Sequence, residues 1–282
     1  MTTQAKLTTG SRIGVCAPSS RLSQPHFDQG CAVLRAQGFD VFVHPQCTEQ
    51  DGQIAGSAQS RAVAFQALLL DNSVNAIIFT GGGHRAAEII PLLDWDTLKS
   101  IAPKIVMGYS DNTALLHALH ARLNWTTIYG PTVQAIGRTE STEPDTWAQS
   151  LAVLNGATPA YNLRYNGPEV TGKIVAATLS MLPLLLDTDD MPDLNGALLC
   201  VEDLHEELST IDRLMLLLKR KGVFDKIAGL VCGQFLHLTD SGRPFGFDLE
   251  QIVRHHAGNT PVGFDAPFGH GDFLYALPLG VK

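Results

Sequence analysis

Short apolar runs alternate with helix-type segments along the first half of the chain, and this alternation constrains the fold more than any other feature. The runs are continuously apolar, as in strands that are buried on both faces. In the segments between them, apolar residues recur every three or four positions, the pattern of an amphipathic helix. The expected strands are residues 12–17, 40–43, 76–80 and 104–108. The expected helices are residues 25–37, 57–70, 85–93 and 112–122. The alternation predicts an α/β fold with a parallel sheet that is covered by helices.

Glycine and proline interrupt the periodic pattern between residues 139 and 172, so we expect a linker or domain crossing over 139–172. An N-terminal α/β domain over residues 1–138 would precede this segment, and a C-terminal domain over residues 173–282 would follow it. In the C-terminal part the expected strands are residues 197–201 and 228–235, and the expected helix is 209–220.

The composition is typical of a globular protein of one or two domains, with 282 residues, 45% hydrophobic and 17% charged. A net charge of −8 without a Lys/Arg cluster argues against a nucleic acid or a membrane as partner. We see no apolar signal segment and no run that approaches the ~20 residues of a transmembrane helix, so we expect a cytoplasmic location. Five widely spaced cysteines and the lack of ligand-type spacing predict no disulfide framework, no metal and no cofactor.

Ser110 lies between the expected strand 104–108 and the expected helix 112–122, in the segment Gly-Tyr-Ser-Asp-Asn. A serine on a tight strand-to-helix turn exposes its hydroxyl at the sheet edge, beside the unpaired N–H groups that begin a helix. Nucleophilic catalysis needs this arrangement. The competing interpretation is that Ser110 and Asp111 only cap the helix, because Asn112 stands where a hydrolase turn has glycine.

Three glycines, residues 81–83, follow the expected strand 76–80 and belong to the same sheet edge as Ser110. With the next three residues they match the dinucleotide-binding pattern G-x-G-x-x-A. The nearest following acids, Asp94 and Asp96, come earlier than the ~20 residues that this pattern requires. An alternative use of the glycines is to let backbone N–H groups approach a substrate oxyanion.

Two acids and one histidine are further candidates. Glu202 and Asp203 end an expected strand, so one carboxylate points to each side of the sheet. A carboxylate at such a position can orient an imidazole. His270 lies between two glycines in an expected tight turn, where its ring is not committed to a core. The residues alone choose neither between Glu202 and Asp203 nor among the ten histidines.

Taken together, these segments resemble the LD-carboxypeptidases (muramoyltetrapeptide carboxypeptidases) and their relatives, the microcin C immunity peptidases. The resemblance extends along nearly the whole chain. It is carried by G-Y-S-D-x-T-A-L at 108–115, Tyr-Gly-Pro at 129–131, E-D-x-x-E at 202–206 and P-x-G-H-G at 267–271. This order and spacing are specific, although no one motif is specific alone.

The resemblance implies a Rossmann- or flavodoxin-like N-terminal sheet, a smaller β-rich C-terminal domain and a homodimer. It implies a Ser-Glu-His triad in which Ser110 is the nucleophile, Glu202 the orienting acid and His270 the general base. It also implies an oxyanion hole made by the N–H of Asp111 and an N–H of Gly82 or Gly83. The implied reaction releases the terminal D-Ala of murein tetrapeptides from meso-diaminopimelate or L-Lys, in peptidoglycan recycling.

The chain departs from the family pattern at two segments near the implied site. It has Gly-Gly-Gly-His-Arg at 81–85, where the family usually has Arg-Gly-Gly-Tyr-Gly. It has Ala-Ala-Thr-Leu at 176–179, where the family usually has Gly-Gly-Asn-Leu. The expected substrate contacts are His84, Arg85 and Tyr109. Among them, Arg85 is a candidate for binding the free carboxylate of an exopeptidase substrate, because the guanidinium fork suits a carboxylate.

These departures leave two other functions open. One is a detoxifying amidase that acts on peptidyl- or aminoacyl-adenylate analogues, in which Trp147 or Tyr161 could stack on the purine. The other is not an enzyme: a module that binds a nucleotide phosphate through the glycine segment.

Overall fold

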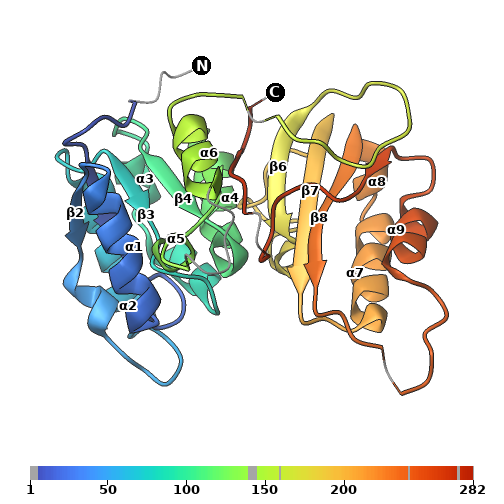
Figure 1. Ribbon diagram of the computed structural model, residues 1–282, viewed down its shortest axis with the longest axis horizontal. Coiled ribbons are helices and arrows are strands. Elements are labelled where there is room, and N and C mark those ends of the chain that lie inside the picture. Colours follow the sequence, from blue (N-terminus) through green and yellow to red (C-terminus); the bar gives the residue numbers. More distant parts are fainter. Residues whose placement is uncertain (1–5, 139–144, 159, 241, 272–273, 282) are drawn as a thin grey trace.

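The computed structural model describes residues 6–138, 145–158, 160–240, 242–271 and 274–281. They form two α/β halves that lie side by side, each built on a sheet of its own (Figure 1). Across the described part of the chain, no helix is both long enough and apolar enough to span a bilayer.

The N-terminal sheet has six strands in the order β10-β5-β4-β3-β1-β2. The strands are β1 (Arg12–Val15), β2 (Asp40–Val43), β3 (Ala76–Ile78), β4 (Ile105–Gly108), β5 (Ile128–Tyr129) and β10 (Leu277–Pro278). Strands β1 to β5 are parallel to one another, whereas β10 pairs antiparallel with β5. The end of the chain therefore returns to the first sheet, which the sequence pattern does not predict.

Helices cover both faces of this sheet. One face packs against α1 (Gln24–Ala36), α5 (Val133–Ile136) and α6 (Asp145–Leu154), and the other against α2 (Ala58–Leu70), η2 (Ala86–Leu92) and α4 (Thr113–Leu123). Alternate side chains divide accordingly, because Ile78 faces the first group and Ile77 the second. The predicted α/β class is confirmed. The expected helix 85–93 is instead the 3₁₀ helix η2, since Pro91 inside it cannot donate a helical hydrogen bond.

The C-terminal sheet has four parallel strands in the order β6-β7-β8-β9. They are β6 (Lys173–Thr178), β7 (Ala197–Leu204), β8 (Gly229–Leu236) and β9 (Val262–Gly263). Helices α7 (Leu208–Arg220), α8 (Val223–Lys226) and α9 (Leu249–Ala257) lie on the side away from the N-terminal half (Figure 1). The remaining short elements are η1 (Pro45–Thr48), α3 (Trp95–Leu98), η3 (Ser110–Asn112) and η4 (Leu179–Leu184).

The inner face of the C-terminal sheet shares a continuous apolar core with the N-terminal half. Leu116 and Leu119 of α4 belong to the same buried cluster as Ala176 of β6 and Phe268. Because apolar burial contributes about 25 cal/mol per Å², this shared core holds the two halves against each other. The shared core thereby holds the C-terminal end of β4, before Ser110, close to the C-terminal end of β7, where Glu202 lies.

Buried His117 joins α4 to β6 and carries a prediction about pH. Its Nε2 lies 2.8 Å from the Ala176 carbonyl oxygen, and burial lowers its pKa to about 4. The unfolded chain binds a proton near pH 6.5, so it holds more protons than the folded chain between pH 6.5 and 4. The free energy of unfolding should therefore decrease as the pH is lowered through this window. Between pH 7 and pH 5, the titration of His117 should account for about 2 kcal/mol of this decrease.

His117→Gln keeps a side chain that can donate to Ala176 but removes the titration. Urea unfolding at pH 7 and pH 5 should show a pH dependence smaller by about 2 kcal/mol in the variant. Comparing the two proteins at each pH cancels the contribution of every other titrating group. Equal pH dependence in both proteins would contradict the assignment.

Candidate active site

Ser110 occupies a strained turn between β4 and α4. Tyr109 is extended, with φ −152°, and Ser110 itself has φ +63°, in the left-handed region that residues other than glycine rarely adopt. Thr113 stabilises the turn, because its Oγ1 donates to the Ser110 carbonyl oxygen at 2.6 Å. Backbone strain of this kind is typical of a nucleophile held at the edge of a sheet.

The glycine segment lies directly against Ser110. A Cβ atom built on Gly82 would come within 2.8 Å of the Ser110 Cβ and 3.1 Å of its Oγ. The Gly81 carbonyl oxygen accepts a hydrogen bond from Asn112 Nδ2 at 3.0 Å. The backbone at Gly82 can approach the hydroxyl this closely only because it carries no side chain.

We expect Gly82→Ala to slow acylation of Ser110 by a serine-directed probe by about 100-fold, because the added methyl group must displace either the hydroxyl or the nearby N–H groups. The measurement is the rate of probe attachment by mass spectrometry. The matched control is Gly242→Ala, since a Cβ at Gly242 meets nothing within 4 Å. Labelling of Gly82→Ala at the wild-type rate would show that this close approach does not matter.

Asp111 connects the turn to two neighbouring loops. Its buried Oδ2 accepts hydrogen bonds from the Ser19 hydroxyl at 2.7 Å and the Ala86 N–H at 2.8 Å. The side chain therefore fixes the start of the short helix that follows Ser110. The backbone N–H of Asp111 belongs to that helix start, where N–H groups without helical partners can receive an anion.

Sequence reasoning misses Arg61, which holds the other end of the glycine segment. This arginine of α2 is buried, and its Nη1 donates to the carbonyl oxygens of Pro18 and Arg85, both at 2.7 Å. Its Nη2 lies 2.8 Å from Glu88. A helical arginine ordinarily indicates a solvated surface, so the pattern contains no signal for this role.

Glu202 is fully buried at the end of β7, and both of its carboxylate oxygens are bonded. Oε2 lies 2.6 Å from Nδ1 of His270. Oε1 accepts the hydroxyl of Tyr129 at 2.6 Å and that of Thr178 at 2.7 Å. A buried carboxylate requires such partners. With Nδ1 of His270 engaged, Nε2 is the ring nitrogen left for proton transfer.

The turn that carries His270 is fitted closely around Glu202. Gly269 has φ +133°, and a Cβ at this position would lie 3.0 Å from Glu202 Oε2. The Gly271 N–H donates to Gln234 Oε1 at 3.0 Å. Glycine on both sides of the histidine therefore reflects lack of space as well as backbone conformation.

Two tyrosines connect Ser110 to this pair. The ring of Tyr109 contacts the ring of His270, with centroids 4.8 Å apart. The Tyr129 hydroxyl donates to Glu202 at 2.6 Å, and the Tyr129 ring makes an edge contact with the Tyr109 ring, with centroids 6.3 Å apart. The structure thus gathers Ser110, Glu202 and His270 into one cluster, although Ser110 comes from the N-terminal half and the other two from the C-terminal half.

Asp203, the alternative acid, points elsewhere. It accepts the N–H of Ser180 at 2.7 Å and that of Leu204 at 2.9 Å. Burial raises its pKa to about 6. The strand alternation that sends Glu202 toward His270 sends Asp203 toward Ser180 of η4, and the role of Glu202 as the orienting acid stays a prediction.

The expected substrate contacts differ in position. Tyr109 is buried in the cluster. His84 is exposed, and its N–H donates to the Ser20 hydroxyl at 3.2 Å. Arg85 is exposed with its Nε 3.6 Å from Glu88, so its side chain takes part in a surface ion pair. Their roles as substrate contacts stay predictions.

The two aromatic candidates for purine stacking have other neighbours. Trp147 makes an edge contact with Phe39 and packs on the buried cluster beneath α1. Tyr161 donates its hydroxyl to the Ala276 carbonyl oxygen and lies beside Tyr275. Trp147 is therefore part of the core packing.

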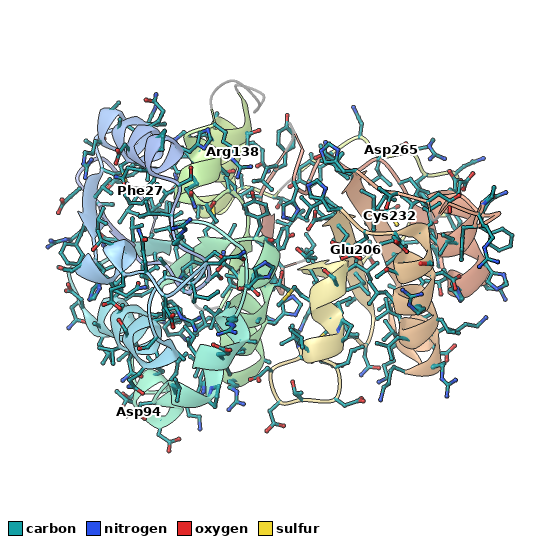
Figure 2. The ribbon with its side chains drawn as sticks, turned by 90° about the horizontal axis from the view of Figure 1, so that it is seen from below. Phe27, Asp94, Arg138, Glu206, Cys232 and Asp265 are labelled. Carbon is teal, nitrogen blue, oxygen red and sulfur yellow. The ribbon has the colours of Figure 1, made fainter. Side chains whose placement is uncertain are left out.

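Arg138 is a cationic residue near this cluster, through its proximity to Tyr109. It is exposed in the N-terminal half (Figure 2); burial raises the pKa of Tyr109, and the positive charge of Arg138 partly counteracts this rise. Tyr109 in turn contacts His270. The sequence contains no signal for this arrangement, because Arg138 follows a short helix in a segment without a motif.

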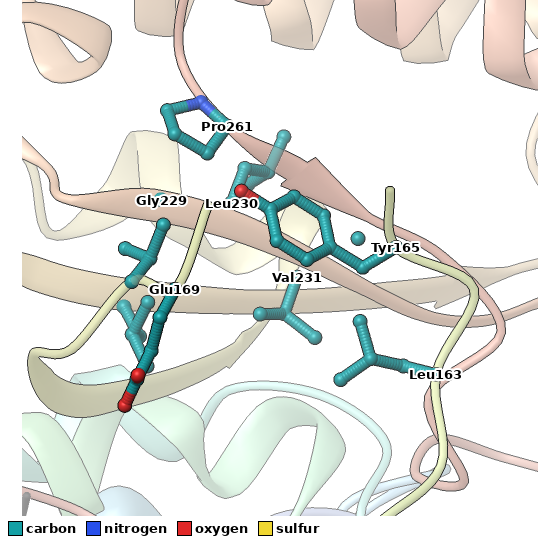
Figure 3. A pocket seen from close by; sticks show the side chains of 10 residues that line it. Leu163, Tyr165, Glu169, Gly229, Leu230, Val231 and Pro261 are labelled. Carbon is teal, nitrogen blue, oxygen red and sulfur yellow. The ribbon is translucent and has the colours of Figure 1, made fainter. Parts of the chain in front are cut away.

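A pocket at the opposite ends of the C-terminal strands is not a second candidate. Figure 3 shows Tyr165, Leu163 and Pro261 around it, and the lining also includes Gly229. The Tyr165 hydroxyl is bonded to the Pro168 carbonyl oxygen. The lining is mostly apolar, and its one carboxylate, Glu169, has no histidine, serine or cysteine beside it in the lining. Within the described ranges, no three His, Cys, Asp or Glu residues are grouped so that they could hold a metal ion.

Comparison with known proteins yields matches along most of the chain. Residues 13–130 match the family model for the LD-carboxypeptidase N-terminal domain, and residues 171–282 match that for the LD-carboxypeptidase C-terminal domain. The microcin C7 self-immunity protein MccF of Escherichia coli is 28% identical, over 99% of this chain and 91% of that protein. The murein tetrapeptide carboxypeptidase of Pseudomonas aeruginosa is 23% identical, over 95% of this chain and 91% of that protein.

A solved structure agrees with these matches. The muramoyltetrapeptide carboxypeptidase from Oxalobacter formigenes superimposes with a TM-score of 0.86 at 25% identity, covering 95% of this chain and 92% of that one. The family resemblance that the motifs indicate is confirmed.

Proposed function

Because this chain belongs to the LD-carboxypeptidase family, we propose that it releases the terminal D-Ala of murein tetrapeptides by hydrolysing its amide bond to meso-diaminopimelate or L-Lys. Membership makes the chain a serine-type peptidase, and we drop the non-enzymatic alternative. The observation that carries the proposal is the 2.6 Å contact between Glu202 and His270, buried beside the strained Ser110 turn.

In the proposed mechanism His270 Nε2 takes the proton of Ser110 as Oγ attacks the carbonyl carbon of the scissile amide. The oxyanion accepts hydrogen bonds from the Asp111 N–H and an N–H of Gly82 or Gly83. Collapse of this intermediate breaks the C–N bond, and the leaving amine of D-Ala takes the proton from His270. Water, deprotonated by His270, then hydrolyses the acyl-enzyme and restores the serine.

Glu202 has two tasks in this mechanism. It accepts the N–H at Nδ1 of His270 and so keeps the proton acceptor at Nε2, and it stabilises the imidazolium that forms. Tyr129 and Thr178 hold the carboxylate in place for both tasks. We further propose that the enzyme works in peptidoglycan recycling as a cytoplasmic homodimer. Light scattering after size-exclusion chromatography tests the dimer.

The test of the proposed reaction is mass spectrometry of a murein tetrapeptide after incubation with the protein. We expect the mass to decrease by one alanine residue, with release of D-Ala. The same peptide ending in L-Ala should remain intact, because the reaction requires the D configuration at the leaving residue. No change in either peptide would contradict the proposed substrate.

A second candidate is a detoxifying amidase that cleaves aminoacyl-adenylate analogues. It is favoured by the 28% identity to the self-immunity protein MccF over 99% of this chain, and by the departure from the carboxypeptidase pattern at residues 81–85. Hydrolysis of an aminoacyl sulfamoyl adenosine, measured beside the tetrapeptide under the same conditions, separates the two. We expect the tetrapeptide to be the better substrate.

A further inference from the structure

We propose that Gln234 of β8 is a positioning residue, which holds the turn around His270 so that the imidazole keeps its contact with Glu202. The inference deepens the proposed function and rests on it, because His270 is a base only in the proposed mechanism. Three observations support it: an irregularity in β8 beside Glu202, the hydrogen bonds of Gln234 to the turn, and the close packing between them.

Strand β8 is irregular where it passes Glu202. The pairing of β7 with β8 shifts by one residue between positions 201 and 203, so two residues of β8, Gly233 and Gln234, lie opposite the single residue Glu202. An extra residue in one strand is a β-bulge, which bends the strand and redirects a side chain, and bulges are frequent next to active sites. The bulge therefore places Gln234 beside the acid of the proposed triad.

Gln234 is hydrogen-bonded to the turn on both sides of His270. Its backbone N–H donates to the Phe268 carbonyl oxygen at 2.9 Å, and its side-chain Oε1 accepts the N–H of Gly271 at 3.0 Å. One residue of β8 thus spans the segment that carries the base. His270 lies between two glycines, whose backbones have more conformational freedom than those of other residues. Contacts from outside the turn are therefore needed to keep it in one conformation.

The turn lies directly against Gln234. A Cβ built on Gly271 would come within 2.5 Å of Gln234 Oε1. A Cβ built on Gly269 would lie 3.0 Å from Glu202 Oε2 and 3.2 Å from Gln234 Cβ. Gln234 and Glu202 thus both border Gly269, the residue before His270. A shift of the Gln234 side chain would consequently displace the backbone that holds the imidazole against the carboxylate.

The proposed mechanism depends on the exact place of this imidazole, because His270 transfers a proton in both acylation and deacylation. Its Nδ1 lies 2.6 Å from Glu202 Oε2, and its ring is 4.8 Å, centroid to centroid, from the ring of Tyr109. A displacement of about 1 Å at such a group can cost about 100-fold in rate. Because Gln234 acts through His270 and not on the substrate, its loss should lower kcat and leave KM nearly unchanged.

The first test is the kinetics of D-Ala release by Gln234→Met. Methionine fills a similar volume, but its sulfur is only a weak acceptor for the Gly271 N–H. We expect kcat to fall by about 30- to 100-fold, with KM changed by less than about twofold. Gln234→Glu keeps an acceptor oxygen for the same N–H, so its kcat should return to within about tenfold of the wild type.

The second test asks whether Gln234 acts through His270. The measurement is the rate at which a serine-directed acylating probe labels Ser110, followed by mass spectrometry. Gln234→Met should slow labelling by about 30-fold in the otherwise wild-type protein. In the His270→Ala background the same change should slow it by less than about threefold, because no base remains to be positioned.

The matched control is Gln66→Met in α2. Gln66 is also partly buried, and its Oε1 also accepts a backbone N–H, that of Asp94 at 2.7 Å. The control therefore loses the same kind of hydrogen bond outside the cluster. Urea unfolding should show a similar loss of stability in Gln66→Met and Gln234→Met, whereas only Gln234→Met should lose kcat and labelling rate.

Three outcomes would overturn the inference: a kcat of Gln234→Met within about threefold of the wild type, Gln234→Glu no faster than Gln234→Met, or equal slowing of labelling with and without His270. Labelling requires no peptide, so it reports separately from the proposed function. Labelling that depends on Gln234 and His270, without D-Ala release by the wild type, would support the positioning role while the proposed reaction fails.

Discussion

Ser110→Ala is expected to reduce D-Ala release from a murein tetrapeptide by about 10⁴- to 10⁶-fold. The substitution removes the atom that forms the acyl-enzyme, and what remains is the smaller rate enhancement from substrate binding and the oxyanion donors. The measurement is the initial rate of D-Ala release at saturating tetrapeptide. Because the residue is proposed to act with His270 as a unit, the Ser110→Ala/His270→Ala double variant should be little slower than either single variant.

The control for Ser110→Ala is Ser73→Ala, which removes an exposed hydroxyl that donates to Asp71 at 2.7 Å and accepts a long bond from Arg12 at 3.4 Å. It should keep the wild-type rate. Near-ultraviolet circular dichroism should show that Ser110→Ala is folded, since both serine and alanine bear a Cβ in the same left-handed conformation. A residual rate within tenfold of the wild type would rule out Ser110 as the nucleophile.

Glu202→Gln is expected to reduce kcat by about 10⁴-fold. Glutamine fills the same volume and can still accept Tyr129 and Thr178 at Oε1, but its amide nitrogen would face Nδ1 of His270. Two N–H groups cannot share that contact, so the imidazole must place its proton on Nε2 and can no longer take one from Ser110. The measurement is kcat for D-Ala release.

The matched variant is Asp203→Asn, the same change at the next residue of the same strand. Asp203 accepts two backbone N–H groups and does not contact His270, so this variant should lose stability while kcat falls by less than tenfold. Urea unfolding separates the two effects. If Asp203→Asn lowered kcat as much as Glu202→Gln, the assignment of the acid would be wrong.

The parts of the site that a sequence reveals are those with a local pattern. The turn at Ser110 combines a buried strand, a glycine and an amphipathic helix within a few positions, so its place at the sheet edge could be predicted. The alternation of strands and helices likewise predicts a covered parallel sheet. The family resemblance supplied Glu202 and His270, which no local pattern singles out.

What the sequence does not reveal depends on contacts between distant residues. Tyr129 and Thr178 lie in apolar strands, where a hydroxyl gives no sign that it will meet a carboxylate 73 or 24 positions away. Arg61 resembles a surface residue of a helix until two loops close over it. Strand β10 has only two residues, Leu277 and Pro278, so periodicity cannot detect it. In each case the partner comes from tertiary packing.

The buried bond between Tyr129 and Glu202 ties a strand of one sheet to a strand of the other. Activity should therefore report on how the two halves are seated, because a displacement of about 1 Å between nucleophile and base can cost about 100-fold in rate. Low concentrations of urea, or hydrostatic pressure, should inactivate the protein while both sheets still give their native circular dichroism. If activity is lost first, the rate of turnover reports on the alignment between the two halves more sensitively than circular dichroism does.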